Sequence, residues 1–251
     1  MSESTRSIIV QKFGGSVLGS DASRRSAAEH VARRRFANED VVAVVSAMGR
    51  GADPYATDAL RALVSPPQTA GDHAALDLLM SCGEVISSVV FAQALRDVGL
   101  DAKPIPPTRL GLVTTPHFGN ARILSIDTSY LAHLLAQGVT PVVPGFIGLT
   151  QDGEPTTLGR GGSDITAASI AVAMRASSLE LFKDVGAIHN ADPRLEPTAC
   201  ALEEVSYEEL TRIAASGSRP VIHADAIAIA REARLMMVVR GLDARASTLI
   251  R

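Results

Sequence analysis

Short apolar runs rich in Val and Ile alternate along this chain with longer segments of helical periodicity. Because parallel strands are joined by long crossover connections, usually helices, this alternation predicts an α/β fold with a largely parallel sheet. Asp152 and Gly153 predict the turn of a β-hairpin that ends at Leu158. The expected strands of the sheet cover residues 8–13, 41–46, 139–143, 179–183 and 236–240.

Helices are expected where apolar residues recur at helical spacing. The first should lie on the surface, with Asp21 and Ser23 as possible N-terminal caps. The long apolar segment before residue 98 predicts one broken helix or two consecutive buried ones, whereas the prolines at 104, 106 and 107 exclude a helix there. The expected helices cover residues 20–37, 74–98, 165–175, 207–215 and 224–232.

Composition limits the classes of function. The 251 residues are enough for one domain, or for one domain with two lobes, and no repeat or linker divides them. A net charge of −3 provides no basic field, so no nucleic-acid partner is expected. The apolar stretches fall short of the ~20 residues that span a bilayer, and residues 1–7 lack the apolar core of a signal peptide. Two cysteines, Cys82 and Cys200, without Cys-x-x-Cys spacing favour a reducing compartment, the cytoplasm.

Two glycine-rich turns each join an expected strand or hairpin to a helix start, and each contains a cation. Lys12 precedes Gly14 and Gly15, and Arg160 precedes Gly161 and Gly162. Backbone N–H groups and the helix dipole bind anions at such turns, so the pair favours oligophosphate binding over two merely tight turns. The turns match neither the P-loop pattern nor the Gly-x-Gly-x-x-Gly pattern of dinucleotide-binding folds.

Six segments resemble, in order and spacing, the successive signatures of the aspartate kinases, which belong to the amino-acid kinase family. The resemblance extends over about residues 7–250. The segments are Val-Gln-Lys-Phe-Gly-Gly-Ser at residues 10–16, Val-Val-Ser-Ala-Met-Gly at 44–49, Asp-Pro-Tyr-Ala-Thr-Asp at 53–58, Ser-Cys-Gly-Glu at 81–84, Thr-Leu-Gly-Arg-Gly-Gly-Ser-Asp at 157–164 and Ala-Asp-Pro-Arg at 191–194.

The resemblance implies a three-layer αβα sandwich formed by one amino-acid kinase domain over residues 1–251. About residues 1–155 would form the lobe that binds the amino-acid acceptor, and about residues 156–251 the lobe that binds ATP. It also implies ATP-dependent phosphorylation of the β-carboxylate of L-aspartate to 4-phospho-L-aspartate, the entry step to lysine, threonine and methionine. Mg²⁺ would be held mainly by the nucleotide phosphates, because no clustered carboxylates form a metal cage in the sequence.

The same resemblance assigns the residues of phosphoryl transfer. Lys12 is similar to the family's catalytic lysine, and Asp164 to the aspartate that orients it, although a helix N-terminal cap is compatible with Asp164 as well. Gly14, Gly15 and Ser16 would donate hydrogen bonds to the phosphates. A carboxylate acceptor is already ionised at pH 7, so the site needs cancellation of charge and in-line positioning more than a general base.

Ser46, Glu84, Arg160 and Ser163 are assigned by the resemblance to the acceptor. Glu84 would pair with the ammonium group of an amino acid and Arg160 with its α-carboxylate, assisted by Ser163. Glu84 could instead be a solvated residue at a helix N-terminus. Many family members have a threonine at the position aligned with Ala52, and its absence leaves a different carboxylate acceptor open.

Nucleotide binding is expected to involve Lys183, Asp184, Arg194 and Arg219, in addition to Lys12 and the first glycine turn. Family members usually have a threonine where this chain has Lys183, so a cation replaces a hydroxyl group near the expected nucleoside. Asp184 and Arg194 match their counterparts and would contact the ribose or base and the phosphates. Arg219 keeps the positive charge of a Gly-Ala-Lys motif.

Three functions stay open at this point. The first is an aspartate kinase, and the second is a related kinase with another carboxylate acceptor. The third is a nucleotide-binding regulatory subunit without turnover, which Lys183 and the unexplained Ala224-Asp225, in place of the family's Pro-Arg, could indicate. The joint presence of the charged residues assigned to catalysis and acceptor binding argues against the third.

Other features have less specific interpretations. His223 is expected to cap a helix or pack in the core, and Cys82 to be a small buried packing residue rather than a nucleophile. The chain ends where the kinase domain should end, without an ACT-type domain, so we expect no feedback inhibition by lysine or threonine through the chain itself. An apolar face of residues 74–98 could form a homodimer interface.

Overall fold

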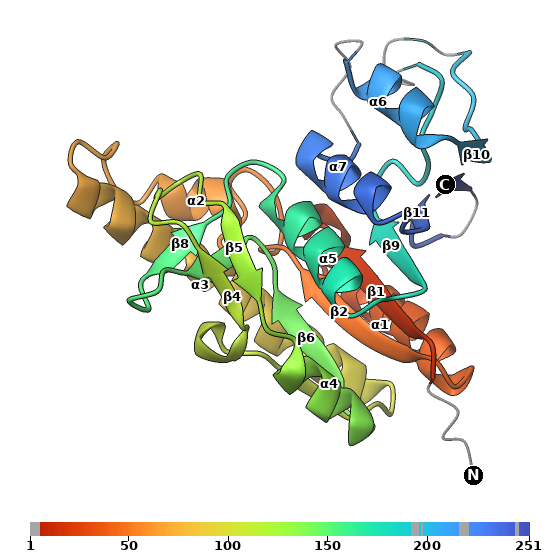
Figure 1. Cartoon of the computed structure of the whole chain (residues 1–251), viewed down its shortest axis with the longest axis horizontal. Helices are drawn as coiled ribbons and strands as arrows, with labels where there is room; N and C mark the ends of the chain where they lie inside the picture. The colour runs from red at the N-terminus through yellow and green to blue at the C-terminus, as the bar shows by residue number, and fades with distance from the viewer. Residues whose placement is uncertain (1–5, 192–195, 197, 216–220, 244–245) are drawn as a thin grey trace.

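Residues 6–191, 196, 198–215, 221–243 and 246–251 are described by the computed structural model. Within them, a sheet of eight strands has the order β10-β12-β11-β9-β1-β2-β6-β3 (Figure 1). Every neighbouring pair is parallel except β11 with β12, so the predicted parallel sheet is confirmed. Its strands are β1 (Ile8–Phe13), β2 (Asp40–Val45), β3 (Ala102–Pro104), β6 (Thr140–Pro144), β9 (Ser178–Phe182), β10 (Glu204–Val205), β11 (Met237–Arg240) and β12 (Ser247–Ile250).

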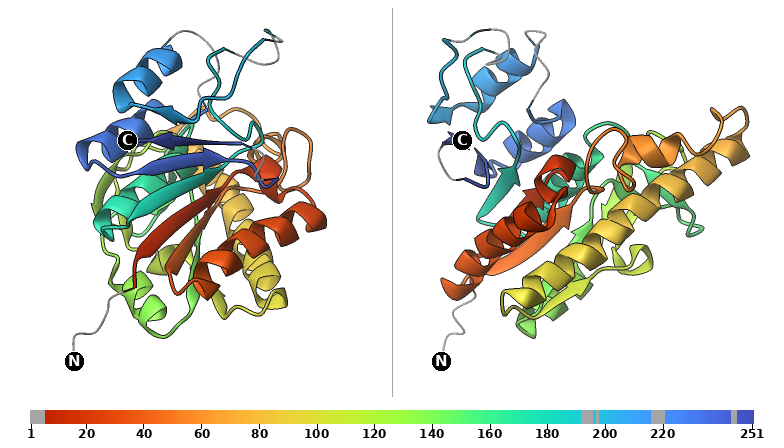
Figure 2. Two further views of the ribbon diagram at one scale, coloured as in Figure 1. Left: turned by 90° about the vertical axis from the view of Figure 1, so that its right-hand side faces the viewer. Right: turned by 180° about the vertical axis from the view of Figure 1, so that it is seen from behind.

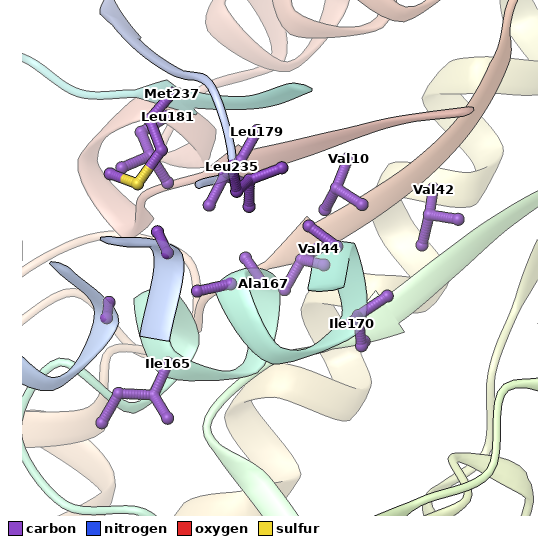
Figure 3. Close-up of a cluster of buried hydrophobic side chains, with 14 of the residues drawn as sticks. Val10, Val42, Val44, Ile165, Ala167, Ile170, Leu179, Leu181, Leu235 and Met237 are labelled. Atoms are coloured by element: carbon purple, nitrogen blue, oxygen red, sulfur yellow. The ribbon is translucent and has the colours of Figure 1, made fainter. Parts of the chain in front are cut away.

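Helices cover both faces of this sheet, which confirms the three-layer sandwich (Figure 2). Side chains alternate along β2, so that Val42 and Val44 enter one hydrophobic core and Val41, Ala43 and Val45 enter the other. The first core is completed by helices on one face, and Figure 3 shows side chains of one of them, α5, beside those of β1 and β2. The first core contains residues of α4 (Ser129–Ala136), α5 (Gly162–Ala173), α6 (Tyr207–Ala215) and α7 (Ala224–Glu232), and the second those of α1 (Asp21–Phe36) and α3 (Ala70–Asp97).

A second sheet of four strands lies at one end of the large sheet (Figure 1). The predicted hairpin is confirmed, and its turn contains Gly153 with φ of +86°, a left-handed conformation that glycine adopts without strain. The hairpin leads directly into the second glycine turn. In the order β5-β4-β7-β8, the strands are β4 (Leu112–Thr114), β5 (Ile123–Ile126), β7 (Ile147–Leu149) and β8 (Pro155–Thr157).

Helix α3 is one continuous helix of 28 residues, so the expectation of a break is wrong. Thr69 and Asp72 form a capping box that fixes its start. α3 also contains a window with mean hydropathy of 1.6 that is long enough to cross a membrane, which the sequence expectation missed because polar residues interrupt the pattern. Half of this window is buried inside the fold, where α3 packs against α1, β3 and β6 as a core helix does.

The shorter elements differ from expectation at their ends. Ser20 caps α1 through the backbone N–H of Ser23 at 3.1 Å, so Ser23 takes part as predicted while Asp21 lies in the first turn. A 3₁₀ helix begins at Pro107 despite the three prolines, since proline lacks only an N–H that the first turn leaves unused. The remaining short elements are the 3₁₀ helices η1 (Gly15–Leu18) and η2 (Pro107–Arg109) and helix α2 (Thr57–Arg61).

Candidate active site

The turn after β1 is packed against the loop after β2. Gly15 has no room for a side chain, because an added Cβ atom would lie 2.4 Å from the carbonyl oxygen of Ala47 and 2.8 Å from that of Gly49. Gly49 N–H donates to the Gly15 carbonyl at 2.9 Å, and Gly14 N–H donates to the Phe182 carbonyl at 3.2 Å. The Gly14 N–H is therefore engaged, and the N–H groups at the start of η1 are the ones left for a ligand.

A cavity of about 210 Å³ opens at the carboxyl ends of β1, β2 and β9, the edge at which open α/β sheets bind ligands. It brings together residues that are far apart in the sequence, and cations outnumber carboxylates in its lining, which suits an anion. The lining consists of Lys12, Gly14, Gly15, Ser16, Ser46, Gly49, Arg50, Lys183 and Asp184.

Asp164 is paired with two lysines at this cavity. Its Oδ1 lies 2.8 Å from the Nζ of Lys12, while the Nζ of Lys183 lies 2.8 Å from Oδ1 and 2.7 Å from Oδ2. Asp164 is 4% exposed and Lys12 is 5% exposed. Burial by itself raises the pKa of Asp164, but the charges of the two lysines outweigh this effect and hold the pKa well below its usual range. The cluster thus contains one carboxylate and two amines.

Helix α5 presents Asp164 to the lysines. The helix begins at Gly162 rather than at residue 165, and its N-cap is Gly161, which has φ of +75° and makes no side-chain capping bond. An added Cβ atom on Gly161 would lie 2.4 Å from the side chain of His223, so glycine is required there for space as well as for conformation. Asp164 lies in the first helical turn and bonds to the lysines, so its interpretation as a helix cap is wrong.

Glu84 is buried in α3 below the loop that follows β2. It is 2% exposed, so the alternative of a solvated residue at a helix N-terminus is wrong. Its Oε1 accepts a hydrogen bond from Ala47 N–H at 3.0 Å, and its Oε2 has no partner among the described residues. Burial raises the pKa of Glu84 to about 8, opposed by the Ala47 hydrogen bond and the charge of Lys12. A buried oxygen without a partner can receive a donor from a ligand.

The other predicted acceptor residues occupy different positions. Ser46 lines the cavity, whereas Arg160 and Ser163 do not. Arg160 is exposed on the second glycine turn, after Gly159 with φ of +71°, and its guanidinium group has no hydrogen bond or ion pair with another described residue. Ser163 is 8% exposed and lies against Gly145, where an added Cβ atom would be 2.8 Å from the Ser163 Cβ.

Lys183 lies beside Lys12, because both lysines bond to Asp164, and its expected position near the nucleoside stays a prediction. Phe182 at the end of β9 pairs with Phe13 of β1, so residue 183 follows at the edge where the first glycine turn begins. Burial lowers the pKa of Lys183 to about 8; the charge of Asp164 opposes this effect, and the charge of Lys12 adds to it.

Arg50 is a cavity residue that sequence reasoning missed. Its Nη2 lies 3.0 Å from Asp184 Oδ2, and the two side chains are 65% and 47% exposed, so water screens the pair. The sequence feature that could have indicated Arg50 is its position directly after the Val-Val-Ser-Ala-Met-Gly segment. Arg194 and Arg219, predicted to bind the nucleotide, lie outside the described residues.

Asp77 was also missed. This residue of α3 is 1% exposed and accepts hydrogen bonds from Gly119 N–H at 2.8 Å, from Thr157 N–H at 2.7 Å and from the Thr157 hydroxyl at 2.8 Å. Burial raises the pKa of Asp77, against the effect of these hydrogen bonds. Asp77 joins α3 to the end of β8, just before the second glycine turn. The sequence feature that could have indicated it is a single acidic residue between two leucines, Leu76 and Leu78.

His223 is the N-cap of α7, and its Nδ1 accepts from Asp225 N–H at 3.3 Å, which confirms the capping interpretation. Asp225 lies in the first turn of α7, where the helix dipole favours a negative charge, so the reversed charge has a structural reason. Cys82 is exposed, so its interpretation as a buried packing residue is wrong.

Comparisons with known proteins identify the fold family. Residues 7–241 match the model of the amino acid kinase family. The chain belongs to the amino acid kinase family. Aspartokinases are among its relatives within this family, which confirms the resemblance of the sequence motifs.

Three similar proteins illustrate the relationship. The chain is 42% identical to Aspartokinase 1 of Bacillus subtilis (strain 168) over 233 residues, which is 93% of this chain and 57% of that protein. The crystal structure of aspartate kinase from Synechocystis has a TM-score of 0.82 at 32% identity and covers 97% of this chain and 39% of that one. Escherichia coli aspartokinase III in complex with aspartate and ADP has a TM-score of 0.76 at 26% identity, over 97% of this chain and 64% of that one. This amino acid kinase chain thus spans little more than half the length of the curated relatives it matches.

Proposed function

We propose that the chain catalyses ATP-dependent phosphorylation of the β-carboxylate of L-aspartate, giving 4-phospho-L-aspartate and ADP. The observation that carries the proposal is the buried cluster at the first glycine turn, in which Lys12 and Lys183 share Asp164 beside a cavity. Similarity to aspartokinases, one of them in complex with aspartate and ADP, supports the choice of acceptor and nucleotide.

The chemistry of the reaction explains the need for such a cluster. The acceptor carboxylate requires no deprotonation at pH 7, but its charge repels the triphosphate. A β-carboxylate oxygen bonds to the γ-phosphorus as the bond to the β,γ-bridging oxygen breaks, and the electron pair leaves with ADP. Lys12 would stabilise the charge on the phosphoryl oxygens, and the ionised Asp164, 2.8 Å away, would hold the lysine in place.

The acceptor would be recognised by groups of complementary charge. The free Oε2 of Glu84 would receive the ammonium group, which requires Glu84 to lose its proton on binding. Arg160, exposed on the second glycine turn, would pair with the α-carboxylate, assisted by Ser163 and Ser46. The ammonium and carboxylate groups of the amino acid would thus each pair with a side chain of opposite charge.

The nucleotide would bind through its phosphates at the first glycine turn. The N–H groups of Gly15 and Ser16 at the start of η1 would donate to them, and Asp184, Arg194 and Arg219 would contact the rest of the nucleotide. Mg²⁺ would be held by the phosphates, whose charge it would neutralise, since the described residues contain no group of three His, Cys, Asp or Glu side chains able to hold an ion.

The arrangement of the chain supports three broader proposals. Residues 1–155 would form the acceptor lobe and residues 156–251 the nucleotide lobe. The first glycine turn of one lobe and Arg160 of the other would meet at their junction, where the phosphoryl group is transferred. The exposed Leu78 and Val89 on α3, 54% and 50% accessible, would contribute to a homodimer interface. A cytoplasmic location fits an ATP-dependent reaction and two free cysteines.

A second candidate is a kinase for another carboxylate. It is favoured by Ala52, which is exposed in the loop after β2 and provides no hydroxyl group at a position where many family members have a threonine. The two candidates share the phosphoryl chemistry and differ only in the acceptor.

Hydroxamate formation tests the proposal. Purified protein is incubated with Mg-ATP, hydroxylamine and L-aspartate, beside a panel of other carboxylates. We expect aspartyl hydroxamate from the wild type and a loss of at least about 100-fold for Lys12→Ala, because a transition-state cation is removed. Lys103→Ala, at an exposed lysine far from the glycine turns in sequence, should leave the rate unchanged. Product with another acceptor alone would favour the second candidate, and bound ATP without any product would favour a non-catalytic subunit.

A further inference from the structure

Lys183 occupies a place in the ion cluster that its sequence position did not predict. We propose that Lys183 is a second phosphoryl-binding lysine, which contacts the transferred γ-phosphoryl group together with Lys12, rather than a residue of the nucleoside site. This inference rests on the proposed function, because it assigns a catalytic contact within the same reaction.

The amines of Lys12 and Lys183 lie next to each other, because both contact the same carboxylate oxygen. Both Nζ atoms lie 2.8 Å from the Oδ1 atom of Asp164, so they are at most twice that distance from each other. Both lysines line the cavity, and the side chain of Lys183 is 15% exposed against 6% for that of Lys12. One tetrahedral anion in the cavity can therefore contact both amines.

The charge of the cluster calls for an anion. Two ammonium groups share a single buried carboxylate, which leaves one positive charge uncompensated. The other charged residues of the cavity, Arg50 and Asp184, pair with each other at 3.0 Å and so do not compensate it. Burial of an unpaired charge is unfavourable, and a bound phosphoryl group would remove this cost.

A purely structural role explains Lys183 less well. Asp164 already has an ion pair with Lys12, and a hydroxyl group could satisfy its second oxygen without adding a buried charge. Burial lowers the pKa of Lys183 to about 8, so the ligand-free cluster holds this proton weakly, and an approaching anion would strengthen its hold. In the transfer step no proton leaves Lys183, which stabilises charge on the phosphoryl oxygens while the electron pair departs with ADP.

Nucleotide binding separates the two possible positions of Lys183. The variant Lys183→Met keeps the length of the side chain and removes its charge, and Lys103→Met is the matched control at an exposed lysine. Calorimetry measures the binding of ADP and of the non-hydrolysable triphosphate analogue AMP-PNP, and the hydroxamate assay gives kcat and KM. Circular dichroism checks that each variant is folded.

We expect Lys183→Met to bind ADP within about threefold of the wild type and AMP-PNP at least about tenfold more weakly, because only the analogue has a γ-phosphate. The value of kcat should fall by about 100-fold or more, as on removal of a transition-state donor, and Lys183→Arg should restore part of it. Lys103→Met should change none of these quantities.

If Lys183→Met binds ADP and AMP-PNP more weakly by the same factor and keeps its kcat, the inference is overturned. Lys183 would then contact the nucleoside rather than the γ-phosphate. A wild type that binds neither nucleotide would overturn the proposed function itself, and the assignment of Lys183 with it. If Lys183→Met does not fold, the same comparison is made with Lys183→Thr, which has the residue usual in the family and a hydroxyl group to bond Asp164.

Discussion

Burial acts in different directions on three ionisable side chains near the proposed reaction centre. Asp164 stays ionised because two lysines surround it, whereas burial raises the pKa of Glu84 to about 8 and lowers that of Lys183 to about 8. Near neutral pH the ligand-free site therefore contains a mostly protonated Glu84 and a mostly protonated Lys183, whose proton is held less tightly than that of an ordinary lysine. Binding of an ammonium group and of a phosphate would shift both pKa values toward their usual ranges.

The pKa of Glu84 predicts how acceptor affinity depends on pH. An ammonium group pairs with the carboxylate form, so KM for L-aspartate should fall by up to about tenfold per pH unit between pH 6 and pH 8 and then level. Glu84→Gln should raise KM and remove this dependence. Steady-state assays across this pH range measure KM for L-aspartate. KM for ATP serves as the control, because its pH dependence should differ from that of KM for L-aspartate. A pH-independent KM in the wild type would exclude Glu84 as the ammonium partner.

The same residue predicts the pH dependence of stability. The folded-state pKa of Glu84, about 8, lies above its ordinary value of 4.5, so the folded protein binds more protons than the unfolded chain between these values. The contribution of Glu84 to the free energy of unfolding should therefore fall as the pH rises through this window. Urea denaturation of the wild type and of Glu84→Gln, compared at pH 5 and pH 8, isolates it. A difference between the two proteins that is the same at both pH values would contradict a buried, protonated Glu84.

The residue types of the site could be predicted from the sequence better than their surroundings. Lys12 and Asp164 were predicted to act together, and they form an ion pair at 2.8 Å. The position of Lys183 depends on β9 lying next to β1, a pairing of strands far apart in the chain, which local patterns do not specify. The burial of Glu84 depends in the same way on the loop after β2 covering α3.

Two contacts between neighbouring elements hold the glycine turns in place. The 3₁₀ helix η1 follows Gly15, whose backbone is pressed against the loop after β2. Asp77 of α3 accepts three hydrogen bonds from Gly119 and Thr157 and so ties the second glycine turn to a core helix. Neither contact could be predicted from the sequence, because α3 was expected to be broken and the turn was recognised only as glycine-rich.

Gly15→Ala should displace the first glycine turn. The added methyl group would lie 2.4 Å from the backbone carbonyl oxygen of Ala47, so one of the two loops must move. We expect a loss of about 1–3 kcal/mol of stability, as for overpacking, together with a large fall in kcat. Urea denaturation and the hydroxamate assay measure the two effects.

A matched glycine provides the control for this substitution. Gly71 lies in the first turn of α3, and an added Cβ atom there would meet only the Thr69 hydroxyl oxygen, at 3.8 Å. Gly71→Ala should therefore be neutral or stabilise slightly, since alanine has the higher helix propensity. Equal behaviour of the two variants would contradict the close approach at Gly15.

Asp77→Asn should affect acceptor binding more than nucleotide binding. The amide can accept fewer of the three hydrogen bonds and leaves buried groups unpaired. We therefore expect the free energy of unfolding to fall by about 1–3 kcal/mol. Because β8 leads into the turn of Arg160, KM for L-aspartate should rise while KM for ATP stays unchanged. Asp97→Asn, at the exposed end of α3, is the control. A rise in KM for ATP alone would contradict this role of Asp77.

The sandwich as a whole places the cavity where three parallel strands end together. The carboxyl ends of β1, β2 and β9 bring Lys12, Ser46 and Lys183 to one edge of the sheet. Helix α5, which packs on one face of the sheet, contributes Asp164. The alternation of strands and helices predicted an α/β fold with a largely parallel sheet, and the family resemblance implied the three layers. The order of the strands, which decides which residues meet, required the structure.

Identification of the phosphorylated atom tests the proposed aspartate kinase activity directly. The protein is incubated with Mg-ATP and L-aspartate, the product is reduced with borohydride, and mass spectrometry identifies the resulting alcohol. Phosphorylation of the β-carboxylate predicts homoserine in proportion to the ADP formed, and none with Lys12→Ala. An alcohol derived from the α-carboxylate, or no alcohol although ATP is bound, would contradict phosphorylation of the β-carboxylate.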